Sequence, residues 1–288
     1  MEKVVIVDSN GLGWASYYTL GHLSNDEMRV GVIFGFLNQV LTIAEKFNTN
    51  KFIFSWDSRK NRRRILFPEY KIGRRKANDE RTPEEIAELN MMFMQFDQLR
   101  TEILPFLGFS NIIRKTGFES DDVIANFIRQ QNEEEMSIHV ISSDEDLWQL
   151  IQRNVLQYAP KSGKTMVRSK FIKEWGIEPE QWGLVKAIAG CPSDEVPGIE
   201  KVGPKTAVKY LLGQLKETTK TFKAIEAGKD IIERNKPLVI LPFEEFEVPF
   251  NRDDKFQIKR FRYIFKKFNF QSNLKPDKLN RWEEAFCK

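Results

Sequence analysis

The sequence has few of the residues that build disulfide frameworks and thiolate or imidazole metal sites. Its 288 residues include two cysteines and two histidines. The cysteines, Cys191 and Cys287, make no disulfide framework, and two histidines are too few for a His-rich metal site. This usage excludes a disulfide-stapled secreted scaffold and indicates a reducing cytoplasm.

Long apolar runs are also lacking. No run approaches the ~20 residues that cross a bilayer, so we expect no association with membranes. The N-terminal segment MEKVVIVD reaches an acid after a short apolar run, and we therefore expect no secretory signal. Hydrophobic residues make up 41% of the chain and charged residues 30%, which indicates a globular protein with a sizeable core.

Positive charge is concentrated rather than spread. The net charge is +4, yet residues 59–76 alone hold nine Lys/Arg and one acid. A second basic stretch, rich in aromatic residues, spans 255–270. Such asymmetry favours nucleic acid as a partner, although a solvated surface loop is the alternative. The candidate DNA contacts in the first stretch are Arg62, Arg63, Arg64, Arg75 and Lys76.

The order of apolar patterns predicts an α/β fold. Runs at 4–7, 51–56 and 138–142 are typical of buried strands, and a shorter strand is expected at 111–115. Helical spacing covers 30–47, a capping box opens a helix at 82, and another helix begins near 119. This alternation predicts a mostly parallel central sheet flanked by helices. We expect a core over 1–168 and a helical region over 169–288, the later part of which packs on the sheet.

Acidic residues follow the predicted strands. Asp8, Asp57 and Asp144 come directly after the three buried runs, or within two residues of them. Because carboxyl ends of parallel strands share one edge, we expect these side chains to converge. Further acids at a helix start and beyond the third strand complete a set of seven: Asp8, Asp57, Glu119, Asp121, Asp122, Asp144 and Asp146. Glu145 should point away from its neighbours into solvent.

So many carboxylates at one edge would have strongly raised pKa values unless cations were bound. The lack of nearby histidine or cysteine favours Mg²⁺ or Mn²⁺ over zinc. Each acid taken alone is more readily explained as a helix cap or a turn residue. Their recurrence at strand ends favours a metal centre, and an acidic metal centre beside a basic segment suits phosphodiester hydrolysis.

The segment GIEKVGPKTAVKYL, residues 198–211, indicates a phosphate contact. Gly198 and Gly203 flank a tight turn before a helix that starts at Pro204, with Lys201 and Lys205 beside it. Backbone amides in such a turn can bind a phosphate oxygen, and a helix–hairpin–helix would grip duplex DNA without reading bases. The segment SGKT at 162–165 lacks the P-loop spacing and predicts a hairpin turn instead.

Five short motifs in order resemble the 5′-nuclease family. They are VDSN (7–10), FPEYKIGRR (67–75), FESDD (118–122), ISSDEDLWQL (141–150) and SDEVPGIEKVGPKTA (193–207). The family includes phage ribonuclease H and flap endonucleases and the 5′-nuclease domain of bacterial DNA polymerase I. The resemblance covers residues ~3–235, and the chain looks most like the phage members. For a phage-encoded chain, this implies a location in the host cytoplasm.

The resemblance implies a PIN-like 5′-nuclease fold with a helical arch at 71–100 and a helix–hairpin–helix near 186–212. The implied activity is that of a structure-specific 5′–3′ exonuclease, flap endonuclease and ribonuclease H that removes RNA primers or 5′ flaps during DNA replication. It implies two Mg²⁺ ions, for which Mn²⁺ can substitute, and K⁺ at the hairpin. Asp194 would help to hold the second ion, while Lys71 and Arg74 would contact the scissile phosphate.

The implied partners are DNA, RNA–DNA hybrids and forked or flapped 5′ ends, with a single-stranded DNA-binding protein or a polymerase as protein partners of a monomer. Three positions depart from the family pattern: Cys191 replaces a usual aspartate, Ser9 a glycine and Ala15 an arginine. A neutral thiol is a poor ligand for Mg²⁺, so a non-catalytic nucleic-acid-binding relative stays an alternative. A nucleotide-sugar transferase with a metal motif at 144–146 is a weaker one.

Overall fold

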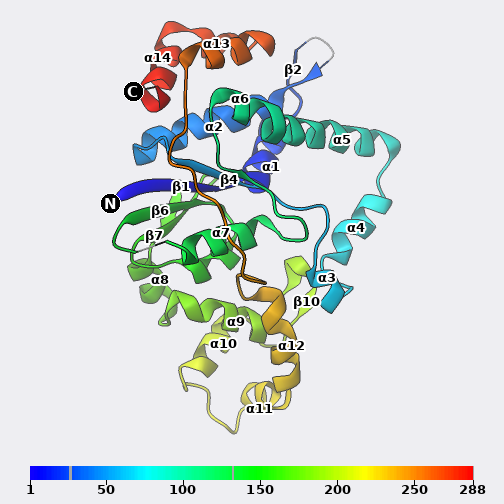
Figure 1. Cartoon of the computed structure of the whole chain (residues 1–288). Helices are drawn as coiled ribbons and strands as arrows, with labels where there is room; N and C mark the ends of the chain where they lie inside the picture. Colours follow the sequence, from blue (N-terminus) through cyan, green and yellow to red (C-terminus); the bar gives the residue numbers. More distant parts are fainter. Residues whose placement is uncertain (26–27, 132, 288) are drawn as a thin grey trace.

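A mostly parallel six-stranded sheet forms the centre of the molecule (Figure 1). The computed structural model describes residues 1–25, 28–131 and 133–287. The strand order is β5–β4–β1–β6–β7–β8, and β8 alone runs antiparallel to its neighbour in this sheet. The strands are β1 (Glu2–Asp8), β4 (Phe52–Ser55), β5 (Ile112–Ile113), β6 (Met136–Ile141), β7 (Val155–Ala159) and β8 (Lys164–Met166).

The central strands form because their apolar runs can be buried on both faces. All four residues of Val4–Val7 are fully buried, and β1 pairs with β4 on one side and β6 on the other. The predicted strands at 4–7, 51–56, 111–115 and 138–142 are thus confirmed. The segment SGKT closes the β7–β8 hairpin, where Gly163 adopts a left-handed φ of 67°.

Helices cover both faces of the sheet. On one face α1 (Ser9–Leu20), α2 (Gly31–Phe47) and α5 (Pro83–Gln98) share a core with Val5 and Val7. On the other face α7 (Ser120–Arg129) packs against Val4 and Ile6. A π-helical turn (Leu99–Ile103) joins α5 to α6 (Leu104–Leu107), and a small hairpin of β2 (Ser24–Asn25) and β3 (Met28–Arg29) follows α1.

The segment between β4 and α5 lies to one side of the sheet. It contains α3 (Arg63–Leu66) and α4 (Ile72–Asp79), and Figure 1 shows α4 followed by α5 at the right of the view. Thr82 caps α5 through the capping box that the sequence predicted, with Glu85 as its partner. The two helices α4 and α5 occupy the stretch for which an arch was predicted.

A second helical layer follows the sheet. It consists of α8 (Arg168–Trp175), α9 (Trp182–Ala189), α10 (Pro204–Leu211), α11 (Lys220–Ala227) and α12 (Lys229–Val239), with the strand pair β9 (Gly190–Cys191) and β10 (Val196–Pro197). These helices have an apolar core of their own, centred on Phe171, Trp182 and Val185. The 3₁₀ turns are Glu145–Leu150, Pro179–Gln181, Pro192–Asp194 and Gln271–Leu274.

The C-terminal segment returns to the sheet. After α12 the chain runs back past α7, where Asn126 and Gln130 donate to the carbonyls of Glu244 and Phe246 (Figure 1). The last helices, α13 (Ile258–Lys267) and α14 (Pro276–Phe286), then join the apolar core of α2 and α5. The end of the chain therefore packs on the sheet, as expected, while a boundary at residue 168 stays a prediction. No helix in the described residues is long and apolar enough to span a membrane.

Candidate metal centre

Carboxylates gather where three parallel strands end. Asp8 is the last residue of β1 and lies opposite Ser55, the last residue of β4. Asp57 follows β4 by two residues, and Asp144 follows β6 by three. The register pairs Val7 with the last residue of β6, so all three acids lie at one edge of the sheet. The predicted convergence therefore follows from strand register.

Asp8 is held in place by its own helix and by a neighbouring strand end. Its Oδ1 accepts a hydrogen bond of 3.0 Å from the backbone N–H of Gly11, which makes it the N-cap of α1. Its Oδ2 accepts one of 3.1 Å from the Ser142 hydroxyl. A Cβ at position 11 would lie 2.4 Å from Oδ2, so the capping geometry requires glycine there.

Asp57 and Asp144 are likewise positioned by neutral donors. The N–H of Ser120, at the start of α7, donates to Asp57 Oδ1 at 2.8 Å. The N–H of Asp146 donates to Asp144 Oδ1 at 2.8 Å, so Asp144 caps the following 3₁₀ turn. Within the described ranges, no Lys, Arg or His forms an ion pair with Asp8, Asp57, Asp121 or Asp144. These four acids are called the open carboxylates below.

The open carboxylates repel one another. Burial, followed by the charges of Asp57 and Asp144, raises the pKa of Asp8 to about 7. Burial raises the pKa of Asp121 well above its ordinary value, and Asp144 and Asp8 raise it further. Burial also raises the pKa of Asp57 and of Asp144, which face Glu119 and Asp146 respectively. A set of hard oxygen donors with unfavourable mutual charge fits a divalent cation such as Mg²⁺ or Mn²⁺.

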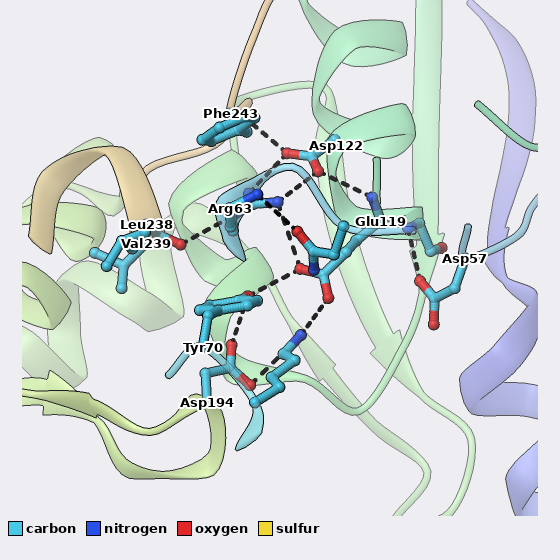
Figure 2. Close-up of polar contacts among 12 residues, drawn as sticks. Asp57, Arg63, Tyr70, Glu119, Asp122, Asp194, Leu238, Val239 and Phe243 are labelled. Atoms are coloured by element: carbon cyan, nitrogen blue, oxygen red, sulfur yellow. Dashed lines mark hydrogen bonds and ion pairs between the residues drawn. The ribbon is translucent and has the colours of Figure 1, made fainter. Parts of the chain in front are cut away.

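Glu119 is balanced by cations of the protein itself. Lys71 Nζ lies 2.5 Å from its Oε1, and Arg63 lies 3.4 Å from its Oε2. The Tyr70 hydroxyl is 2.9 Å from the same Oε2 (Figure 2). Burial favours a raised pKa, but Lys71 and then Arg63 outweigh it, so the pKa of Glu119 lies below its ordinary value. Glu119 is therefore ionised, and the positive charges of Lys71 and Arg63 balance its negative charge.

Asp194 is contacted by Tyr70 and Lys71, which also contact Glu119, and by Arg74. Its Oδ2 is 3.0 Å from the Tyr70 hydroxyl (Figure 2), and its Oδ1 is 3.3 Å from Arg74 and 3.5 Å from Lys71. The backbone N–H of Lys71 donates to the Asp194 carbonyl at 3.0 Å. Lys71 and Arg74, the predicted phosphate contacts, thus lie at the carboxylate edge. Lys71 directly precedes α4, and Arg74 lies within it.

Asp146 lies beside a thiol and a lysine. The potential ligand atoms of Asp146, Cys191 and Asp194 all lie within 4.8 Å of one another, and no other trio of such residues in the described part of the chain is as tight. Lys186 Nζ is 2.5 Å from Asp146 Oδ1, and the Cys191 thiol donates to Oδ2 at 3.3 Å. Burial raises the pKa of Cys191 to about 12, so the thiol is neutral. Glu145 is exposed, as predicted.

Two predicted site residues instead form a buried ion pair. Arg63 is 2% exposed and donates to both oxygens of Asp122 at 2.7 and 2.8 Å (Figure 2). The backbone N–H groups of Phe243 and Glu119 fill the remaining acceptor positions of Asp122 at 2.8 and 3.1 Å. The prediction of Asp122 as a metal ligand is therefore wrong, because its oxygens are taken. The prediction of Arg63 as a DNA contact is also wrong, because the guanidinium is buried.

The other residues predicted to contact DNA differ in their exposure and in the contacts they make. Arg62 pairs with Glu244 at 2.6 Å and lies over the Phe118 ring, while Arg64 donates to the Tyr70 carbonyl at 3.2 Å. Exposed positions are those of Lys76, Lys201, Gly203 and Lys205. The side chain of Arg75 lies outside the part of the chain that the structure describes. Gly198 is half-buried, and a Cβ there would lie 2.1 Å from the Ala189 carbonyl carbon.

Tyr70 and Lys186 contact the centre but were not identified from the sequence. Tyr70 is 1% exposed and joins Glu119 to Asp194, and Lys186 pairs with Asp146. Tyr70 stands inside the FPEYKIGRR motif, which was a usable signal. Lys186 had none, because an isolated lysine on a short helix is usually a solvated side chain.

The chain is similar to several known proteins. The family model described as the 5′-3′ exonuclease N-terminal resolvase-like domain matches residues 3–176. The 5′-3′ exonuclease of Aquifex aeolicus (strain VF5) is 28% identical over 90% of this chain and 88% of its own length. That of Buchnera aphidicola subsp. Acyrthosiphon pisum (strain APS) is 31% identical over 81% and 78%. DNA polymerase I of Bacillus subtilis (strain 168) is 30% identical over 81% of this chain but 26% of its own length.

Solved structures share the fold. A T5 5′-exonuclease structure with divalent metal ions (zinc) bound has a TM-score of 0.72 at 21% identity, covering 84% of this chain and 90% of that one. The catalytic core of Rad2 in complex with a DNA substrate has a TM-score of 0.54 at 13% identity, covering 94% and 89%. At these identities the likeness confirms the predicted α/β architecture with its flanking helices.

Adjacent acids at 121 and 122 should respond oppositely to amide substitution. Asp122→Asn leaves the buried Arg63 without its main partner, and we expect the free energy of unfolding to fall by about 3 kcal/mol. Asp121→Asn removes a repelling charge, so the metal-free protein should become more stable. Thermal unfolding in EDTA measures both, and each variant is the matched control of the other. Destabilisation by both substitutions would contradict the division between paired and open carboxylates.

The metal-free protein should gain stability when the pH falls from 8 to 6.5. The folded-state pKa of Asp8 is raised to about 7, so its unfavourable charge is removed as pH drops through that value. His139, with a pKa lowered by burial to about 4, acts oppositely but mainly below pH 6.5. Melting temperatures in EDTA and in Mg²⁺ measure the effect. We expect Mg²⁺ to raise the melting temperature most at pH 8; an equal Mg²⁺ effect at both pH values would contradict this.

Proposed function

This chain belongs to the 5′–3′ exonuclease family, and from that premise we propose that it is a structure-specific nuclease. It acts as a 5′–3′ exonuclease and flap endonuclease on DNA and as a ribonuclease H on RNA–DNA hybrids, removing RNA primers or 5′ flaps during replication. The observation that carries the proposal is the set of open carboxylates at the sheet edge, directly beside Lys71 and Arg74. Metal-holding acids next to phosphate-binding cations suit phosphodiester cleavage.

The open carboxylates and Glu119 would hold Mg²⁺, for which Mn²⁺ could substitute. When bound there, the ion would supply Lewis-acid stabilisation of the phosphate and activation of the attacking water. The side chains supply the rest of the arrangement. Asp8 and Asp144 are fixed by capping a helix and a 3₁₀ turn, and Asp57 is fixed by the first turn of α7. Rigid capping contacts keep the donors in place before an ion arrives.

Lys71 and Arg74 would bind the scissile phosphate. Lys71 is paired with Glu119 and Asp194, and Arg74 with Asp194 alone; Lys71 is 11% exposed whereas Arg74 is 62% exposed. A phosphate entering the site would offer them a stronger anionic partner, and an ion at the open carboxylates would take over Glu119. Arg74, together with Lys76 on the exposed side of α4, would guide the strand under the arch formed by α4 and α5.

The turn between α9 and α10 would hold the duplex part of the substrate. Gly203 is the N-cap residue of α10, and its Cβ position is open space, so a phosphate oxygen could approach the helix N-terminus. Lys201 is 85% exposed, with a left-handed φ of 61°, and Lys205 is exposed on the first turn. These features support a helix–hairpin–helix that grips the backbone and could hold K⁺ through carbonyl oxygens.

The substrate class sets the expected partners. A monomer that binds forked or flapped 5′ ends would work beside a single-stranded DNA-binding protein or a polymerase in the cytoplasm. One feature favours a second candidate, a nucleic-acid-binding relative without catalysis: Cys191, a neutral thiol beside Asp146 and Asp194, stands where the family resemblance implies an aspartate. Cleavage separates the two candidates.

We expect the protein to cut a 5′-labelled flap and an RNA–DNA hybrid only when Mg²⁺ or Mn²⁺ is present. Asp144→Asn should lower kcat by roughly 10²-fold or more, the scale on which a single electrostatic stabiliser acts, because one anionic donor is lost. Gel-resolved product formation measures cleavage, and fluorescence anisotropy in Ca²⁺ measures binding.

Glu145→Gln is the matched control, since Glu145 adjoins Asp144 but is solvated. It should keep full activity, and Asp144→Asn should keep its DNA affinity. Binding without cleavage by the unmodified protein across a titration of both metals would refute the nuclease and leave the non-catalytic relative.

A further inference from the structure

Lys186 places its ammonium group against a carboxylate of the sheet edge. Its Nζ lies 2.5 Å from Asp146 Oδ1, and its side chain is 15% exposed. Its ammonium group also lies over the Trp182 ring at 5.7 Å. The Trp182 indole N–H in turn donates to the carbonyl of Glu145 at 2.9 Å, which fixes α9 against the segment that carries Asp146. The ammonium group is therefore held at the carboxylate by the packing of α9.

Each carboxylate oxygen of the tight trio already lies beside a donor group of the protein, although Asp146 Oδ1, which faces Lys186 Nζ, makes no hydrogen bond of its own. The second oxygen of Asp146 accepts from the Cys191 thiol, and the two oxygens of Asp194 face Tyr70 and the pair Lys71 and Arg74. The thiol itself adds no negative charge. Since Mg²⁺ requires anionic or carbonyl oxygens and gives up its water reluctantly, this trio does not fit a second hard ion.

We propose that this chain binds a single divalent ion tightly, at the open carboxylates, and that the ammonium group of Lys186 replaces a second ion beside Asp146. The inference rests on the proposed function and narrows it to catalysis with one tight ion. Cys191 and Lys186 act together here, because the thiol removes an anionic ligand and the lysine neutralises the one that remains.

Counting bound Mn²⁺ tests this directly. Metal-free protein is titrated with Mn²⁺, and the free ion is followed by its electron paramagnetic resonance signal. We expect one tight site in the unmodified protein and two in Cys191→Asp/Lys186→Met, which gains a carboxylate and loses the ammonium while keeping an apolar stem. Cys287→Ser, at the cysteine far from the site, should still show one.

Two tight sites of similar affinity in the unmodified protein would overturn the inference, as would a folded double variant with only one. If the double variant does not fold, Cys191→Asp alone should gain a second site at least ~10-fold weaker than the first, a difference of about 1.4 kcal/mol, and its absence would count against the inference. A protein that binds one Mn²⁺ but cuts no substrate would support the single-ion inference while refuting the proposed function.

A different surface carries an independent inference. One face of α13 presents Lys259, Arg262, Tyr263 and Lys266, spaced one helical turn apart; we call it the α13 basic face. Its opposite face is buried through Phe261, Ile264 and Phe265. Among the described residues, no carboxylate forms an ion pair with any of the three cations.

Exposed aromatic rings accompany these cations. Tyr263 is 56% exposed and its ring centroid lies 5.3 Å from that of Phe106, which is 41% exposed on α6. Unpaired cations beside open aromatic rings suit single-stranded nucleic acid, whose bases stack while its phosphates pair with lysine and arginine. Figure 1 shows α13 next to α6, which continues α5 away from α4.

We infer that the α13 basic face binds the single-stranded 5′ segment of a long flap after it passes α5. The test compares short-flap and long-flap DNA by fluorescence anisotropy over a salt series, using Lys259→Glu/Arg262→Glu/Lys266→Glu. The variant should lose the extra affinity for the long flap, and its salt slope on that substrate should fall by about 2, since three single-strand phosphate contacts are lost.

The matched control is Lys161→Glu/Lys164→Glu/Lys173→Glu, at three exposed lysines elsewhere, and it should leave the long-flap affinity higher than the short-flap affinity. Unchanged flap-length dependence in the α13 variant would overturn this inference and leave an acidic protein as the partner of the face. Equal loss of affinity for both substrates would also overturn it, because the face would then not be specific for the single strand.

Discussion

Like charges crowded at one edge of a parallel sheet are the constraint on which the rest of this molecule depends. Parallel strands end together, so acids placed after β1, β4 and β6 must meet. The protein neutralises part of this charge itself, through Lys71 at Glu119 and Lys186 at Asp146. It leaves the open carboxylates without a cation. The open carboxylates are thus the part of the edge that a bound cation would stabilise.

The buried ion pair between Arg63 and Asp122 fixes the start of α7 next to the carboxylate edge. Arg63 Nε also donates to the Leu238 carbonyl at 3.0 Å, and its guanidinium lies 4.9 Å from the Phe243 ring centroid (Figure 2). One side chain thereby joins α3, the start of α7 and the chain beyond α12. Since Glu119 immediately precedes α7, its position depends on contacts made about 120 residues later in the chain. A buried pair of this kind is costly to break, which ties the geometry of the site to global stability.

The segment that carries Lys71 and Arg74 connects the acidic edge to α4 and α5, the stretch for which an arch is proposed. Lys71 has a left-handed φ of 54° and donates its N–H to the Asp194 carbonyl. Tyr70, directly before it, is buried between Glu119 and Asp194. Backbone strain of this kind persists only where surrounding contacts enforce it, and such positions cluster at functional sites. The cations that would meet the phosphate are therefore placed by Glu119 and Asp194, two acids of the candidate metal centre.

The sequence by itself determined the sheet, its edge and most of the acidic set, because strand burial and residue order are local properties. Five ordered motifs were also enough to indicate the family. Only the tertiary structure decided what each charge does. Arg62, Arg63 and Arg64 are indistinguishable in the sequence, yet the middle one is buried against Asp122. Asp121 and Asp122 differ in the same way. Although they are adjacent in α7, Asp121 faces other carboxylates whereas Asp122 pairs with Arg63. The pairing of Lys186 with Asp146 joins residues 40 positions apart through the packing of α9, and no local pattern encodes that contact.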